Sequence, residues 1–138
     1  MITNQPLPIF HLTPAAYYQR QPVDQPYQPA ALAQEGFIHC TAGVDKLIQV
    51  ANYYFADLRD DLLVLEIDSA QLTAPLIFEP PVLAVSGPVG RERNYAADPQ
   101  TLFPHVYGPL NRQAIRRCFA LQRDSTGQWQ LPQATADG

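Results

Sequence analysis

The stretch Leu62–Ile67 reads LLVLEI, a dense apolar run that Asp60-Asp61 precedes and Asp68-Ser69 follows. A short run of branched aliphatic side chains between turn-forming residues is typical of a strand that is buried in the middle of a sheet. The fold is therefore predicted to be organised around this strand.

A second regular pattern predicts an amphipathic helix at residues 43–55. Its apolar side chains recur at the i, i+3, i+4, i+7 spacing of one helix face; they are Val44, Leu47, Ile48, Ala51, Tyr54 and Phe55. Thr41 is the candidate N-cap, and Asp45 lies in the first turn, where a carboxylate is favoured.

Shorter elements are predicted on both sides of these two. Apolar runs predict strands at residues 8–12, 37–40, 76–79 and 103–107. Helical turns are predicted at residues 15–19 and 30–34, the second ended by Gly36. Residues 114–121 fit either a helix or a strand, and residues 127–131 are predicted to pair back across a turn.

The composition indicates one domain. A chain of 138 residues with 46% hydrophobic content can build a single core, so residues 1–133 are predicted to form one domain and residues 134–138 a frayed tail. Fourteen prolines and only 16% charged residues favour strands and rigid loops over long helices.

Charge and patterning also exclude several partners. The net charge is −4 and Lys46 is the only lysine, so the clustered cations that bind long DNA or RNA are not expected. The absence of a long apolar run and of a signal-peptide pattern predicts no membrane association. Two cysteines, Cys40 and Cys118, do not make a disulfide framework, which favours a cytoplasmic location.

Residues 80–102 contain four prolines and show no periodicity, which predicts a long loop. Arg91 and Arg93 in this loop form a cationic pair that can clamp a phosphate or carboxylate. Glu79 ends an apolar strand directly before the loop and is the candidate functional carboxylate. Glu66 is predicted to face outward from its strand, and Glu35 to be a solvated residue at a helix end.

All three histidines lie in strand-like segments: His11 in IFHL, His39 in FIHC and His105 in FPHVY. Side chains alternate along a strand, so each imidazole is predicted to point away from a core face. That core face is predicted to carry Phe10, Leu12, Ile38, Cys40 and Val106. His39 and His105 are therefore predicted to share one polar site, with their rings within about 10 Å.

Two other interpretations of the histidines stay open. A single buried histidine is more often a hydrogen-bonded structural residue than a catalyst. A catalytic zinc ion held by three imidazoles is the other alternative, although the spacing lacks any HxH or HExxH motif and no metal ligand is predicted.

Three segments together resemble the domain-of-unknown-function 952 family. They are IFHL at 9–12, GFIHCT at 36–41 and FPHVYGPL at 103–110, against the family's "eGFIHcs" and "FPHiYGpl" segments. The resemblance spans nearly the whole chain. It implies an α+β fold similar to the ADP-ribosyltransferase catalytic core, with split antiparallel sheets, a cleft and few short helices, in which that superfamily binds NAD.

The resemblance implies that His11 contacts the ribose of NAD, that His39 corresponds to a second histidine of the RNA 2′-phosphotransferase branch, and that Tyr107 or a neighbouring aromatic residue stacks on nicotinamide. The predicted catalytic residues are His39, His105 and Glu79, and the predicted NAD-binding residues are His11, Thr13, Tyr107 and Arg93. The chain lacks the late [QE]-x-E signature of protein-modifying toxins, so toxin-like arginine modification is not expected.

The predicted function is that of an NAD-utilising enzyme of the ADP-ribosyl-transfer type that acts on a small molecule or nucleotide. The alternative is a non-catalytic module that binds a nucleotide or small molecule. A metallohydrolase with three histidine ligands is the less favoured third possibility.

Overall fold

The computed structural model describes residues 8–80 and 102–132. The predicted loop at residues 80–102, with Arg91 and Arg93, therefore lies almost entirely outside the described residues, and so does the predicted tail at 134–138. The helices are α1 (Ala15–Gln19), α2 (Ala30–Glu35) and α3 (Val44–Tyr54), with short 3-10 turns η1 (Ser69–Gln71) and η2 (Arg112–Ala114). None of the described helices is both long and apolar enough to cross a membrane.

The larger sheet has four antiparallel strands in the order β3-β1-β4-β7. Their bounds are β1 (Ile9–Pro14), β3 (Thr41–Ala42), β4 (Leu62–Ile67) and β7 (Ile115–Ala120). The predicted strand at 62–67 is confirmed as β4, with a partner on each side. Residues 114–121, for which the sequence fits either a helix or a strand, contain the strand β7.

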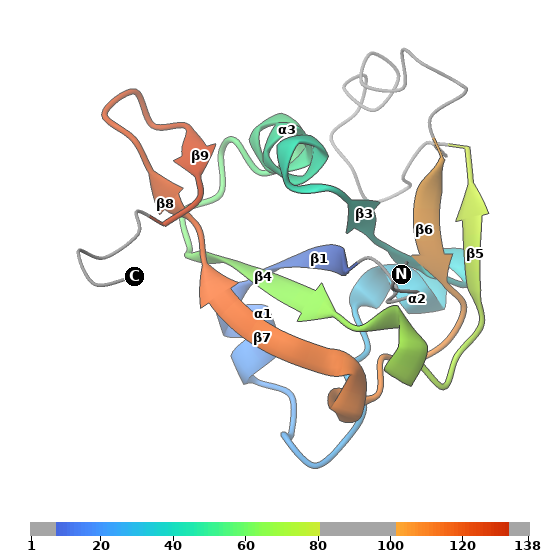
Figure 1. Ribbon diagram of the computed structural model, residues 1–138. Coiled ribbons are helices and arrows are strands. Elements are labelled where there is room, and N and C mark those ends of the chain that lie inside the picture. Colours follow the sequence, from blue (N-terminus) through green and yellow to red (C-terminus); the bar gives the residue numbers. More distant parts are fainter. Residues whose placement is uncertain (1–7, 81–101, 133–138) are drawn as a thin grey trace, which may run out of the picture.

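Both faces of the larger sheet are covered, which explains the uninterrupted apolar run of β4. Helix α3 packs on one face, where Leu47 and Ala51 join Val64 in one apolar cluster. The other face packs against the smaller sheet in a second apolar cluster, which contains Leu65 of the larger sheet and Ile38 of the smaller one. Figure 1 shows α3 above β1 and β4, with the smaller sheet to their right.

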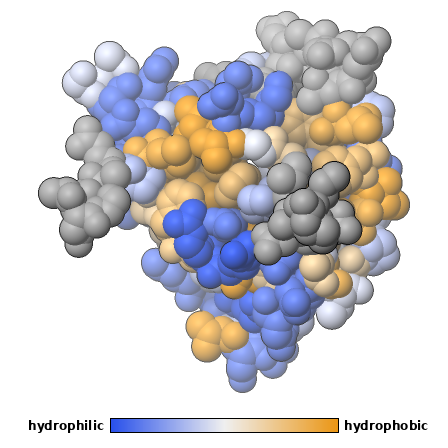
Figure 2. Space-filling model, in the orientation of Figure 1, coloured by the Kyte–Doolittle hydropathy of each residue, from blue (hydrophilic) through white to orange (hydrophobic). Residues whose placement is uncertain are grey.

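The smaller sheet has three antiparallel strands in the order β2-β6-β5. Their bounds are β2 (Ile38–His39), β5 (Leu76–Glu79) and β6 (Phe103–Val106). The edge strand β5 leaves Ile77 and Phe78 about half exposed, and orange atoms are accordingly visible among paler and blue ones at the right-hand edge of Figure 2.

The chain passes from the smaller sheet to the larger within four residues. The strand predicted at 37–40 is shorter than expected: β2 covers only Ile38–His39, and Thr41 and Ala42 then form β3 of the other sheet. The predicted N-cap of α3 is wrong for the same reason: Thr41 is a strand residue opposite Phe10, and Gly43, with φ 95°, takes the N-cap position without a side-chain hydrogen bond.

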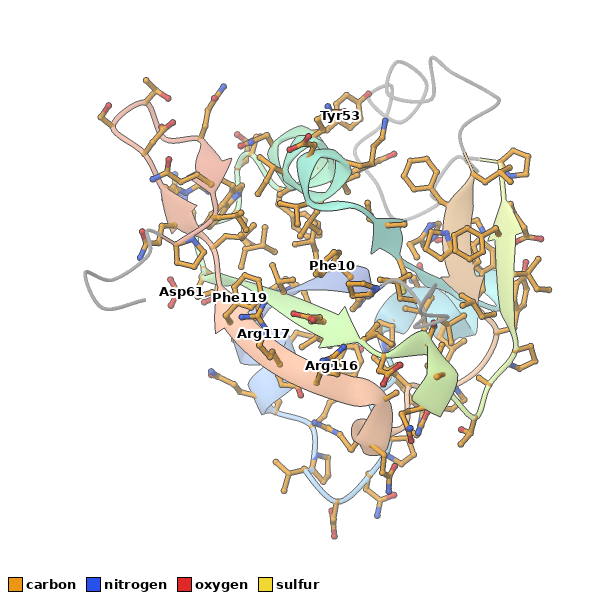
Figure 3. The ribbon with its side chains drawn as sticks, in the orientation of Figure 1. Phe10, Tyr53, Asp61, Arg116, Arg117 and Phe119 are labelled. Atoms are coloured by element: carbon orange, nitrogen blue, oxygen red, sulfur yellow. The ribbon has the colours of Figure 1, made fainter. Side chains whose placement is uncertain are left out.

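The C-terminal part of the described chain adds a hairpin and an ion pair. Strands β8 (Gln122–Arg123) and β9 (Trp129–Gln130) pair across a turn, as predicted. In Figure 3, Arg117 projects from β7 beside Phe119. The Arg117 guanidinium donates to Glu66 Oε1 at 2.7 Å, so Glu66 has a surface partner on the neighbouring strand.

Candidate functional site

His39 and His105 lie directly opposite each other on β2 and β6. Their ring centroids are 5.5 Å apart in an edge-to-face arrangement, so the predicted proximity of the two rings is confirmed. Ile38 and Val106, on the other face of the same strands, are fully buried in the core. The alternation predicted for these two strands is therefore confirmed as well.

His105 is hydrogen-bonded to Glu79, its predicted partner in the site. Nδ1 of His105 lies 2.7 Å from Glu79 Oε1. A carboxylate oxygen only accepts, so Nδ1 carries the proton and a neutral ring keeps its lone pair on Nε2. His105 is 2% exposed, and burial lowers its pKa, partly offset by the bond to Glu79.

Tyr107 binds the same carboxylate oxygen. Its hydroxyl donates to Glu79 Oε1. The hydrogen bonds from Tyr107 and from His105 lower the pKa of Glu79, and the bond to Glu79 raises the pKa of Tyr107. Glu79 is thus an ionised carboxylate held by two donors, with about a third of its side chain exposed.

Phe37 packs against all three rings of the site. Its ring stacks on His105 with a centroid distance of 4.3 Å, and lies 4.8 Å from His39 and 5.2 Å from Tyr107. Phe37 is 7% exposed, so it serves as an apolar platform that restricts the orientation of its neighbours.

Glu35 belongs to the site, and the expectation that it is a solvated helix end is wrong. Its Oε1 lies 2.8 Å from Nε2 of His39, and its side chain is only 6% exposed. Gly36 ends α2 in the left-handed conformation with φ 88°, which turns the chain so that Glu35 reaches back to His39. The spacing Glu-Gly-x-x-His was the sequence signal for this contact.

We call Glu35, Phe37, His39, Glu79, His105 and Tyr107 the histidine–carboxylate cluster. It contains all three predicted catalytic residues and Tyr107 of the predicted NAD-binding set. Predicted NAD-binding residue Arg93 lies outside the described residues. Within residues 8–80 and 102–132, no group of three or more His, Cys, Asp or Glu side chains is arranged to hold a metal ion.

His11 and Thr13 lie in a separate buried network on β1. His11 donates from Nδ1 to the backbone carbonyl of His39 at 2.8 Å and approaches the Tyr27 hydroxyl with Nε2 at 3.4 Å. Tyr27 in turn donates to Thr13 Oγ1 at 2.9 Å. Tyr27 lies between the helical turns predicted at 15–19 and 30–34, outside every predicted element, yet it is fully buried.

The expectation that His11 points away from the core is wrong. His11 is 8% exposed, because β1 belongs to a sheet that is covered on both faces, so neither side of this strand is free. Burial lowers the pKa of His11 to about 4, which keeps the ring neutral. Loss of this ring is therefore expected to leave a cavity in the core.

Cys40 is confirmed as a core residue. It is 3% exposed within the apolar cluster that contains Ile38, and burial raises the pKa of its thiol. A protonated thiol on the opposite face from His39 is not an activated nucleophile.

The fold of the chain is similar to that of a solved protein from Caulobacter crescentus. The crystal structure of protein CC0527 from Caulobacter crescentus aligns with a TM-score of 0.66 and 22% sequence identity, covering 90% of this chain and 94% of that one. Its solution NMR structure aligns with a TM-score of 0.57 and 19% identity, covering 90% and 92%. Sequence identities this low show only that the two proteins share a fold.

No curated protein matches the chain. The family model described as "Protein of unknown function (DUF952)" matches residues 12–118. This range includes both histidines of the cluster and its two carboxylates, and it covers well over half of the chain. The chain therefore belongs to the DUF952 family.

Proposed function

We propose that the protein is an NAD-utilising enzyme of the ADP-ribosyl-transfer type, and that its reaction takes place on the histidine–carboxylate cluster. One observation carries the proposal: His39 and His105 lie side by side, and each is hydrogen-bonded to its own carboxylate. Imidazoles oriented by carboxylates are the usual groups for moving protons on and off substrate hydroxyls.

The charge of the cluster favours one end of NAD. The pKa of Glu79 and the pKa of His105 are both lowered, so this pair carries a net negative charge, which suits a cation and disfavours a phosphate. The nicotinamide ring of NAD is cationic, and the breaking of its glycosidic bond passes through a positively charged, oxocarbenium-like state. The nicotinamide ribose is therefore proposed to lie on the cluster, with Tyr107 against the ring.

The transfer step balances with the groups present. The bond between C1′ of the ribose and the nicotinamide nitrogen breaks, and nicotinamide leaves with the electron pair. A hydroxyl oxygen of the acceptor bonds to C1′, and its proton passes to Nε2 of His105, the ring nitrogen that carries the lone pair. Glu79 holds Nδ1–H of His105 and stabilises the imidazolium that forms.

His11 and Thr13 are proposed to meet the ligand from the buried side. Of the two His11 contacts, the one from Nε2 to Tyr27 is longer, at 3.4 Å. A ribose hydroxyl that replaced Tyr27 there would donate to that nitrogen, as the family resemblance implies.

Calorimetric titration with NAD and ADP-ribose up to millimolar concentration, followed by a nicotinamide-release assay, tests the proposal. The expected result is binding of NAD, slow release of nicotinamide, and affinity for NAD about tenfold above that for NADH, whose ring is neutral. The Glu66→Gln variant, which removes a paired carboxylate of the other sheet, serves as the control and should behave like wild type.

Two outcomes go against the enzyme. Absence of heat with NAD and with ADP-ribose would show that the proposal is wrong. Binding of NAD without any nicotinamide release would point instead to a non-catalytic nucleotide-binding module.

A further inference from the structure

Glu35 is a buried carboxylate whose contacts do not explain it as a structural residue. Its side chain is 6% exposed, and its Oε2 atom is buried without a hydrogen-bond partner among the described residues. It is also the last residue of α2, where the free carbonyl groups carry partial negative charge. Burial, the missing hydrogen bond and this position all disfavour the folded chain.

The contact that Glu35 does make is to His39, and it mirrors the contact between Glu79 and His105. Glu35 accepts from Nε2 of His39, whereas Glu79 accepts from Nδ1 of His105. A neutral His39 therefore has its lone pair on Nδ1, and a neutral His105 has it on Nε2. Within residues 8–80 and 102–132, no hydrogen bond reaches Nδ1 of His39.

We propose that Glu35 is a positioning residue that makes His39 the second acid–base group of the site. Oε1 of Glu35 fixes the ring and keeps the proton on Nε2, so that Nδ1 is the atom that exchanges a proton with the ligand. When Nδ1 takes a proton from a ligand hydroxyl, Glu35 stabilises the imidazolium through Nε2–H. Only the identity of the ligand rests on the proposed function.

The first test needs no substrate. Diethyl pyrocarbonate acylates the lone pair of a neutral imidazole, and mass spectrometry of the peptide containing His39 gives the rate at that residue. Glu35→Gln keeps the size of the side chain and removes the carboxylate that makes Nδ1 a better nucleophile, so at an alkaline pH where the imidazole is neutral in both proteins acylation of His39 should slow about tenfold. Glu66→Gln, the matched control, should leave the rate unchanged, and an unchanged rate in Glu35→Gln would overturn the inference.

The second test uses turnover of NAD. Glu35→Gln should lower kcat about 10- to 100-fold with little change in KM. In a His39→Gln background, the same substitution should have no further effect, because Glu35 acts through His39. Additive losses would show that Glu35 acts elsewhere and would overturn the inference.

The two proposals fail in different ways. If wild type does not turn over NAD, the proposed function is wrong and the acylation rates still decide the role of Glu35. If Glu35→Gln does not fold, as judged by its thermal melt, ¹⁵N NMR of the wild-type imidazoles decides instead. A proton on Nε2 of His39 supports the inference, and a proton on Nδ1 overturns it.

Discussion

His11 and His105 are buried to a similar degree, 8% and 2% exposed, but they lie in two different regions. His11 belongs to the buried network between the sheets, where its partners are a backbone carbonyl and the Tyr27 hydroxyl. His105 belongs to the histidine–carboxylate cluster, where its partner is the ionised Glu79. Burial lowers the pKa of both rings.

The difference lies in what each region can do with a proton. Protonation of His11 places a charge beside neutral groups in the core, so this ring stays neutral and acts through its hydrogen bonds. Protonation of His105 places a charge beside a carboxylate that stabilises it. Exposure alone therefore does not separate the two histidines, whereas the identity of the hydrogen-bond partner does, and we propose that the partner decides which ring exchanges a proton with a ligand.

The greatest loss of turnover is expected when an imidazole of the histidine–carboxylate cluster is replaced. Substituting His39→Gln or His105→Gln should lower nicotinamide release from NAD by about 10² to 10⁴-fold, since each removes one proton-transfer group. Initial rates at saturating NAD measure the loss, and urea melts check that each variant is folded. Rates within a few-fold of wild type in both variants would remove the cluster from the reaction.

The cluster could be predicted from the sequence to the extent that it depends on strand periodicity. His39 and His105 face away from Ile38 and Val106, as alternation requires. Glu35 could not be placed in this way, because its contact depends on the left-handed turn at Gly36 and not on any regular period.

The buried network was not predictable because it depends on contacts between distant segments. Alternation on β1 was correct, but the face that carries His11 is covered by the smaller sheet and by Tyr27. Tyr27 is held in place by two backbone hydrogen bonds with Leu110, 83 positions further along the chain. No local pattern shows that this segment folds inward.

The next prediction tests the structural half of the contrast. His11→Ala should lower the free energy of unfolding by about 3–4 kcal/mol, because it leaves a cavity and an unpaired carbonyl at His39. Urea denaturation at neutral pH measures this loss. A variant as stable as wild type would show that His11 does not support the fold and that the ring serves only the proposed contact with the ligand.

The pH dependence of the free energy of unfolding also tests the buried, neutral state of His11. The pKa of His11 is about 4 in the folded chain and about 6.5 in the unfolded chain, so between these values only the unfolded chain binds the proton. The free energy of unfolding should therefore fall as the pH falls from 6.5 to 4, by about 3 kcal/mol from this residue. Urea melts of wild type and His11→Gln across this range measure it, and equal slopes would contradict it.

A smaller loss of turnover is expected when the hydrogen bond from the Tyr107 hydroxyl to Glu79 is removed. Tyr107→Phe removes this hydroxyl and keeps the ring, while His105 still holds the carboxylate. Turnover should fall about two- to tenfold, because one of two donors to a charged group is lost. Kinetics of the variant with NAD measure this, and a loss as large as that of His105→Gln would show that Tyr107 itself takes part in the chemistry.

The smallest effect is expected from removing metal ions. Among the residues that the structure describes, no group of three or more His, Cys, Asp or Glu side chains is arranged to hold a metal ion, and a length of 138 residues supplies a core that needs no metal to fold. Dialysis against a chelator should therefore leave the thermal melt and NAD binding unchanged, with addition of Zn²⁺ to the dialysed protein as the matched control. A large fall in melting temperature that Zn²⁺ restores would make His39 and His105 metal ligands. The contrast between the two regions would then be one between a hydrogen-bonded network and a metal centre.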